Sequence, residues 1–174
     1  MNLRNTSLAA VLADQLSKYL VMHFCQMNLS VPLIHNYLYL TYILNPGAAF
    51  GFMAGTSTIV RVPFFIAITV GAGMIVYAYQ RFVPQEKVWT RFGLGLIWGG
   101  AMGNFLDRIF YRKVVDFIDV THINFLPVVS IGWFHLGPNF PWIFNVADSC
   151  ITVGIVILML SNWLERSAPE TGAI

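Results

Sequence analysis

The sequence has few charged residues. Asp, Glu, Lys and Arg together make up only 10% of its 174 residues, whereas ordinary soluble domains carry roughly 25%. This scarcity argues against a soluble globular domain. The formal charge of +2, without a run of Lys or Arg, argues against a nucleic-acid partner. Hydrophobic residues account for 57% of the chain and its mean hydropathy is +0.66, so the composition predicts a protein of the lipid bilayer.

Cysteine is almost absent. Cys25 and Cys150 are too few for a disulfide framework and do not form a CxxC metal pair, so each is expected to fill apolar space. The chain also lacks an HExxH motif, a low-complexity tract and a convincing internal repeat. We therefore expect a single integral-membrane domain over residues 1–174.

Four predominantly apolar runs are candidates for membrane spans, which need about 20 residues. They cover 8–24, 61–79, 92–110 and 141–164. The first is the weakest, because it is short and contains Asp14 and Lys18, which lie one helical turn apart and could pair. It begins like a signal peptide, but Asp14 interrupts it before a clear cleavage site, so we expect a retained helix. The predicted fold class is an all-α membrane protein with four transmembrane helices.

The distribution of positive charge predicts the orientation of these helices. No Lys or Arg occurs between residues 19 and 60, whereas the 80–91 connection contains three. The positive-inside rule places that connection and both termini in the cytoplasm, and segments 25–60 and 111–140 on the outer side. Arg61, Arg112 and Lys113 oppose this orientation, although Asp116 and Asp119 could pair with the last two.

Both outer segments are too long to be simple turns. Residues 37–44 are aromatic and β-branched and alternate enough to predict a short strand that ends at Asn45-Pro46-Gly47. The second segment mixes aromatic residues with Gly and Pro, which predicts a mobile interfacial loop or lid. We therefore expect a small β-like segment and a mobile loop beside the four helices.

Two aspartates fall on the outer side of the predicted spans. Asp116 lies just beyond the third apolar run, and Asp148 lies inside the fourth, roughly 10 Å below its start at ~1.5 Å rise per residue. A carboxylate at the hydrocarbon boundary is costly and suggests a functional site. Two carboxylates within reach of one water would share a proton, so one could deprotonate the water while the other acts as an acid. On spacing alone, an ion or proton pathway is an equally good interpretation.

Other polar residues follow helical spacing near these aspartates. Asn104, Asp107 and Arg108 can project from one side of the last turn of the third run. The alternative is an Asp-Arg pair that snorkels to the interface. In the fourth run, a polar stripe must face protein or water, because lipid exposure would be costly; it consists of Asn145, Asp148 and Thr152.

Glycine recurs every fourth residue in the third run, at positions 95, 99 and 103. Such spacing clears one face of a helix of side chains. We therefore expect a neighbouring helix to pack closely against this face.

Five short motifs occur in order along nearly the whole chain. They are Asp14-Gln15-Leu16-Ser17-Lys18, Asn45-Pro46-Gly47-Ala48-Ala49-Phe50-Gly51, Gly103-Asn104 with Asp107-Arg108, Val115-Asp116-Phe117, and Phe144-Asn145 with Ala147-Asp148-Ser149. Each motif would be weak alone. Together, on four predicted spans, they resemble the bacterial signal peptidase II family, also called lipoprotein signal peptidase.

This resemblance implies an aspartyl endopeptidase of the bacterial inner membrane whose active site faces the periplasm. It would remove signal peptides from diacylglyceryl-modified prolipoproteins, just before the lipidated lipobox cysteine. Asp116 and Asp148 would be the catalytic pair, and Asp14, Lys18 and Asp107 would be structural polar residues. The residues that bind substrate or support the pair would be Asn45, Gly47, Asn104, Arg108, Asn145 and Ala147.

The resemblance also implies partners. The enzyme would work as a monomer among membrane lipids, would use no metal or cofactor, and would be inhibited by globomycin-type cyclic peptides. The chain departs from the family pattern in having additional residues around 122–139 and little sequence ahead of Asp14.

Two other functions remain to be weighed. A metallopeptidase could use Asp116, Asp119, His122 and His135 as ligands. A small proton-coupled transporter could use the charged residues of the spans, although the polar residues gather on one side and no inverted pair of broken helices is visible. A purely structural membrane protein would leave Asp116 and Asp148 unexplained.

Overall fold

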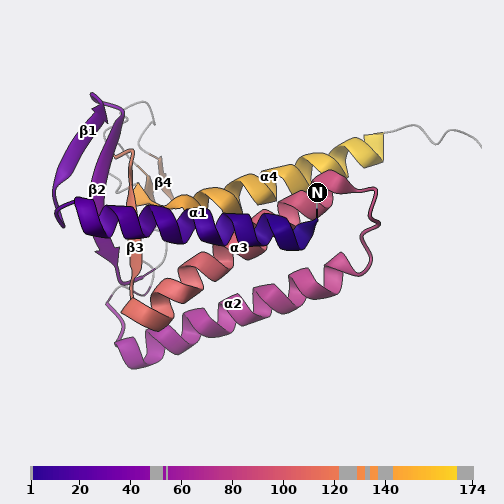
Figure 1. Ribbon diagram of the computed structural model, residues 1–174, viewed down its shortest axis with the longest axis horizontal. Helices are drawn as coiled ribbons and strands as arrows, with labels where there is room; N and C mark the ends of the chain where they lie inside the picture. Colours follow the sequence, from indigo (N-terminus) through magenta and orange to yellow (C-terminus); the bar gives the residue numbers. More distant parts are fainter. Residues whose placement is uncertain are drawn as a thin grey trace, which may run out of the picture. The chain divides into compact units, whose positions relative to one another are not determined.

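The computed structural model describes residues 2–47, 53, 55–121, 129–131, 134–136 and 143–167, with the backbone alone at 129–131, 134–136 and 165–167. In these residues the chain forms four long helices, α1 (Leu3–Phe24), α2 (Thr58–Gln80), α3 (Val88–Tyr111) and α4 (Val146–Ser167) (Figure 1). The chain divides into two compact units. The helical unit contains Met1–Asp14, Phe64–Leu106 and Val146–Ile174, and the sheet unit contains Gln15–Pro63 and Asp107–Asn145.

Each of the four predicted apolar runs is helical over most of its length. Among the described residues, α2 and the Val146–Leu164 part of α4 are long and apolar enough to cross a membrane. Large apolar side chains are exposed on both helices, as at Ile75 (71% exposed) and Met159 (68%), where the surface helix of a soluble protein would present polar groups. The mostly helical fold is confirmed, and the four-pass topology stays a prediction.

All four helices begin at residues other than the starts of the predicted runs, and the shifts of α1 and α4 have a clear cause. α1 begins at Leu3 and not at residue 8, because Asn2 caps it: its side-chain oxygen accepts the backbone N–H of Arg4 (3.3 Å). α4 begins at Val146 and not at residue 141, because Ile143–Phe144 forms the short strand β6 and Asn145 occupies the N-cap position. Asp148 therefore lies in the first turn of α4, and its predicted depth of roughly 10 Å below the helix start is wrong.

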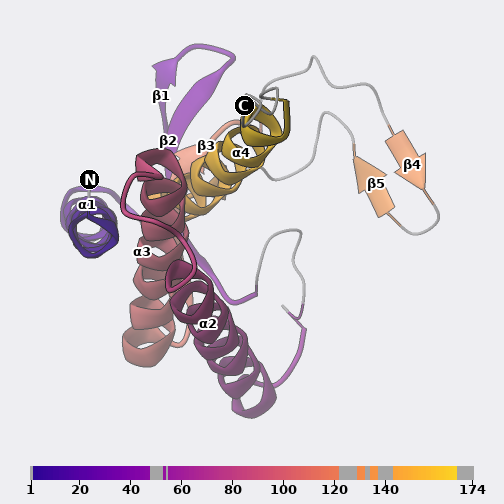
Figure 2. The ribbon, with the colours of Figure 1, turned by 90° about the vertical axis from the view of Figure 1, so that its right-hand side faces the viewer.

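Within the helical unit, α3 packs against α1 and α4 through two glycine faces (Figure 2). A Cβ added at Gly99 would lie 2.6 Å from Ala10 Cβ of α1, and one added at Gly93 would lie 2.9 Å from the carbonyl oxygen of Gly154 in α4. Such short distances mean that the backbones are in near contact. The predicted glycine face at 95, 99 and 103 is confirmed, and the second face, at Gly93 and Gly100, was not predicted.

The sheet unit contains an antiparallel sheet with the strand order β1-β2-β3-β6. The strands are β1 (Ser30–Ile34), β2 (Leu38–Asn45), β3 (Val114–Asp119) and β6 (Ile143–Phe144), and Figure 1 shows the first three side by side. The strand expected at 37–44 is confirmed as β2. The description of 111–140 as a loop is wrong where the structure describes it, because β3 lies there together with the hairpin of β4 (Val129–Ile131) and β5 (Phe134–Leu136).

A buried ion pair lies in the core of the sheet unit. Lys18 Nζ of α1 is 2.9 Å from Asp107 Oδ2 at the end of α3, and both side chains are 1% exposed. Asp107 also accepts hydrogen bonds from Gln15 Nε2 (3.0 Å) and from the backbone N–H of Val115 in β3 (3.0 Å). Asp107 thus links segments of α1, α3 and β3, and the alternative of an Asp107–Arg108 pair at the interface is wrong because Asp107 is buried on Lys18.

The close contact at Gly99 predicts that Gly99→Ala lowers Tm in detergent. The added methyl would meet Ala10 and the Ser7 carbonyl oxygen (2.7 Å), an overpacking that costs about 1–3 kcal/mol. Gly71→Ala on α2 is the matched control, because no atom lies within 4 Å of its Cβ position, and Ala favours a helix over Gly by about 1 kcal/mol. Equal effects of the two substitutions would contradict the packing at Gly99.

The ion pair predicts that Lys18→Met strongly destabilises the protein. Removing the cation leaves a buried carboxylate without its countercharge, which costs about 3–5 kcal/mol. Lys113→Met removes an exposed Lys and should change the free energy of unfolding by less than about 0.5 kcal/mol. Thermal unfolding of both variants checks this, and a Tm of Lys18→Met close to wild type would contradict it.

Candidate active site

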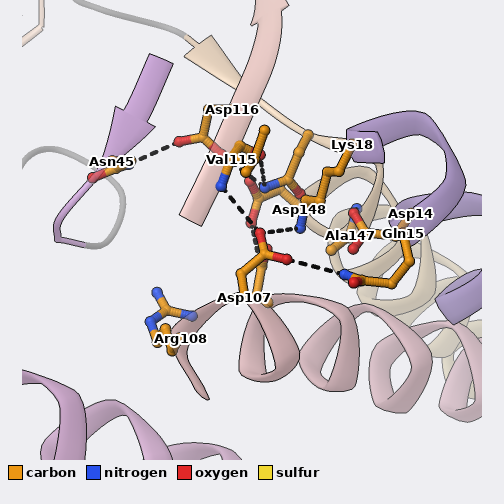
Figure 3. Close-up of polar contacts among 12 residues, drawn as sticks. Asp14, Gln15, Lys18, Asn45, Asp107, Arg108, Val115, Asp116, Ala147 and Asp148 are labelled. Atoms are coloured by element: carbon orange, nitrogen blue, oxygen red, sulfur yellow. Dashed lines mark hydrogen bonds and ion pairs between the residues drawn. The ribbon is translucent and has the colours of Figure 1, made fainter. Parts of the chain in front are cut away.

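Asp116 lies in the middle of β3, opposite Ile43 of β2. It is 2% exposed, and each of its carboxylate oxygens accepts a hydrogen bond from a carboxamide (Figure 3). Asn45 Nδ2 donates to Oδ2 (2.9 Å), and Asn145 Nδ2 donates to Oδ1 (2.7 Å). The two donors fix the plane of the carboxylate.

Asn45 owes its position to the turn after β2. Its side-chain oxygen accepts the backbone N–H of Gly47 (2.9 Å), which is the hydrogen bond of an Asx-turn. Arg108 Nη2 donates to the carbonyl oxygen of Gly47 (3.3 Å). Arg108 therefore supports the turn that orients Asn45 toward Asp116, and the predicted residues Asn45, Gly47 and Arg108 form one connected group.

Asn145 lies between β6 and α4. Its side chain is fully buried, and its amide group also donates to the carbonyl oxygen of Val115 (3.2 Å). Asn145 therefore contacts both the backbone and the side chain of the β3 segment that carries Asp116. Because Asn145 precedes α4, it does not belong to the predicted polar stripe, of which Asp148 and Thr152 lie one turn apart on the helix.

Asp148 lies in the first turn of α4 and is partly exposed. Its Oδ1 accepts a hydrogen bond from Asn104 Nδ2 of α3 (2.8 Å). A helix N-terminus favours a negative charge, because its free N–H groups carry partial positive charge. Asp148 is thus a partly exposed carboxylate whose orientation is fixed by Asn104.

The residue before Asp148 is also held. The backbone N–H of Ala147 donates to Asp14 Oδ1 of α1 (2.9 Å), and both residues are fully buried. Gly103 of α3 provides the space for Asp14, because a Cβ at this position would collide with the Asp14 carboxylate. This contact explains the glycine at position 103 of the predicted motif.

The structure argues against the proposed metal ligands. Asp119 is three residues from Asp116 on the same strand, so the two side chains point to opposite faces. Asp119 accepts hydrogen bonds from Thr41 Oγ1 (2.6 Å) and from the backbone N–H of Thr121 (2.9 Å). No group of three or more His, Cys, Asp or Glu that could hold a metal occurs in the part of the chain that the structure describes. His122, and the side chain of His135, lie outside it.

The predicted site residues thus fall into two groups. In the sheet unit, Asp116 is held by Asn45 and Asn145, with Gly47 and Arg108 behind them; in the helical unit, Asp148 is held by Asn104, and Ala147 by Asp14. The sequence analysis missed the contribution of Gln15 and of the Val115 backbone. The three-residue spacing of Gln15 and Lys18 on one helix face was the available signal for Gln15.

Comparison with known proteins relates this arrangement to a family. Residues 6–164 match the family model described as signal peptidase (SPase) II. The chain is 39% identical over 165 residues to the lipoprotein signal peptidase of Geobacillus thermodenitrificans, which covers 94% of this chain and 91% of the relative. It is 41% identical over 147 residues to the lipoprotein signal peptidase of Desulforapulum autotrophicum, with 84% and 82% covered.

A solved structure is similar over nearly the same length. It is described as a bacterial membrane enzyme studied by the in meso method at 2.3 Å resolution, and it matches with a TM-score of 0.77 and 28% identity over 97% of this chain and 92% of that chain. Together with the apolar helices, this match groups the chain with bacterial membrane proteins. Because the family model matches most of its length, the chain belongs to the signal peptidase II family.

Proposed function

We propose that this protein is a membrane aspartyl endopeptidase that removes signal peptides from prolipoproteins, with Asp116 and Asp148 as its catalytic pair. Family membership supports the reaction. The observation that carries the assignment of residues is the carboxamide support of each aspartate, Asn45 and Asn145 for Asp116 and Asn104 for Asp148. These hydrogen bonds fix the orientation of each carboxylate, which suits a group that must exchange a proton with a positioned water or substrate.

The chain itself supports the pairing of the two aspartates. Asn145, which donates to Asp116 Oδ1, precedes Asp148 by three residues. Three residues span at most about 11 Å of extended chain. We therefore infer that the two carboxylates can approach one water molecule, as two aspartates that share a proton must do.

The proposed chemistry is hydrolysis without a covalent intermediate. One carboxylate takes a proton from water, the water oxygen attacks the carbonyl carbon of the scissile peptide bond, and the other aspartate gives its proton to the carbonyl oxygen. As the tetrahedral intermediate collapses, the first aspartate gives the proton that it took from water to the amine nitrogen, the C–N bond breaks, and the second aspartate takes back a proton from a hydroxyl of the intermediate. The products are a carboxylic acid and an amine, which become a carboxylate and an ammonium group in water, and the enzyme returns to its starting protonation state.

The proposed substrate explains the location of the enzyme. A diacylglyceryl-modified prolipoprotein is anchored in the bilayer by its signal peptide and its acyl chains, so an enzyme with exposed apolar helices can meet it laterally. We propose four membrane passes with both termini in the cytoplasm, the active site facing the periplasm of the inner membrane, and action as a monomer. Globomycin-type cyclic peptides would compete with the substrate.

The alternative functions are less well supported. The family and the relatives are peptidases, and neither supports a proton-coupled transporter. Asp119 is poorly placed to share a metal ion with Asp116, because the Asp119 side chain lies on the opposite face of β3 and accepts a hydrogen bond from Thr41. This weakens the metallopeptidase alternative.

We expect Asp116→Asn and Asp148→Asn each to lower cleavage by at least about 1,000-fold, because the substitution preserves shape and removes the titrating group. The assay is a gel shift with purified enzyme in detergent and a diacylglyceryl-modified prolipoprotein. Asp119→Asn is the matched control, since it changes a buried carboxylate on the same strand and should retain activity. A folded single variant of Asp116 or Asp148 with wild-type activity would refute the catalytic pair.

A strong chelator provides a separate test of the same chemistry. Because the proposed mechanism activates water with carboxylates, wild-type cleavage should be unchanged, within about 2-fold, after incubation with EDTA. Loss of activity that added Zn²⁺ restores would favour the metallopeptidase instead.

A further inference from the structure

The peptide N–H immediately before each proposed catalytic aspartate donates to a buried carboxylate. Val115 precedes Asp116 and donates to Asp107 Oδ2 (3.0 Å), and Ala147 precedes Asp148 and donates to Asp14 Oδ1 (2.9 Å) (Figure 3). The two carboxylates come from different helices, Asp107 from α3 and Asp14 from α1, and lie 8 and 133 residues from the N–H groups that they accept. The same kind of backbone-to-carboxylate hydrogen bond thus occurs in each unit.

In the described part of the sheet unit, side chains bond to the backbone of Val115 where a neighbouring strand would otherwise do so. β6 pairs with β3 at Ile118 and Asp119, further along the strand. At Val115, Asp107 accepts the backbone N–H, and Asn145 donates to the backbone carbonyl oxygen (3.2 Å). Both backbone groups of a fully buried residue are therefore satisfied by side chains, and these contacts fix β3 one residue from Asp116.

Asp107 is itself held in place. Lys18 Nζ donates to Oδ2 (2.9 Å) and Gln15 Nε2 donates to Oδ1 (3.0 Å). With Val115, three donors thus surround one carboxylate that is almost completely excluded from solvent. A carboxylate can accept all three, whereas a neutral amide has one oxygen and would turn its own N–H group toward a donor.

In the helical unit, Asp14 holds the start of α4. Ala147 is the second residue of that helix, so its N–H has no partner within the helix. Asp14 supplies the acceptor, and its negative charge at a helix N-terminus is favourable. The hydrogen bond therefore fixes the first turn of α4, in which Asp148 lies.

From this parallel, we propose that Asp107 and Asp14 are positioning residues, each of which holds the backbone directly before one catalytic aspartate. The proposal rests on the proposed function. Its physical basis is that acid and base groups act only at short, well-defined distances, so a displacement of about 1 Å can cost about 100-fold in rate. Loss of either carboxylate should lower kcat while the peptide is still bound.

The test compares graded variants at both positions, assayed well below the lowest Tm of the set. Asp107→Asn and Asp14→Asn keep one acceptor oxygen and should lower kcat about 10-fold, whereas Asp107→Ala and Asp14→Ala keep none and should lower it about 100-fold, with KM within about 2-fold of wild type. Asp119→Asn is the control for general destabilisation. Asp119 is buried on β3, the strand that carries Asp116, but it accepts hydrogen bonds from Thr41 and Thr121.

The outcomes separate the two proposals. Positioning is supported if kcat falls from wild type to the Asn variants and falls further in the Ala variants, while KM stays unchanged. Folded Asp119→Asn must keep the wild-type kcat. If the Ala variants do not fold, the Asn variants decide. The positioning proposal would be overturned if folded Asp107→Asn and Asp14→Asn kept the wild-type kcat. It would also be overturned if Asp119→Asn lost as much kcat as they do. A fully active Asp116→Asn variant in the same series would instead refute the proposed function.

Discussion

The structure depends on the rule that a carboxylate cannot be buried without partners. In a chain with so few charges, Asp107 and Lys18 are both removed from solvent, and each would be strongly unfavourable alone. Their pairing is tolerated because Asp107 also receives hydrogen bonds from Gln15 and from the backbone of Val115. This single side chain therefore determines where α1, the end of α3 and β3 meet within the sheet unit.

Asp107 and the two proposed catalytic aspartates have different partners in the structure. Asp107 is bound by the ammonium group of Lys18 (2.9 Å). Asp116 and Asp148 receive hydrogen bonds from asparagine side chains, which orient them and carry no charge. The Lys18 contact thus supports the fold, and the asparagine contacts orient the two carboxylates that we propose to exchange protons.

Helices were the most predictable part of this fold. Long apolar runs indicated all four of them, and the glycine spacing at 95, 99 and 103 indicated which face of α3 packs against α1. β2 was predictable because its residues alternate, whereas β3 is buried on nearly every residue and contains two aspartates, so it has no alternating pattern. The start of α4 was misplaced because apolar residues ahead of Asn145 belong to a strand.

The sequence predicted which residues belong to the candidate site, but it did not predict which of them contact one another. The motifs named Asp14, Asn45, Asn104 and Asn145, but periodicity along a chain cannot show that Asp14 would bond to a residue 133 positions away. Partners of this kind depend on tertiary packing. The same limit explains why Gln15 and the backbone of Val115 were missed.

The number of residues between Asn145 and Asp148 determines the direction in which the Asp148 side chain leaves the helix. Asn145 is fixed to β3 by its side chain, and Val146 begins a regular helix directly after it. Each residue of a helix advances the side-chain direction by about 100°, so one inserted or deleted residue would turn the Asp148 carboxylate away from its present direction. A substitution in this segment can keep the direction of the Asp148 side chain, whereas a change in the length of the segment cannot.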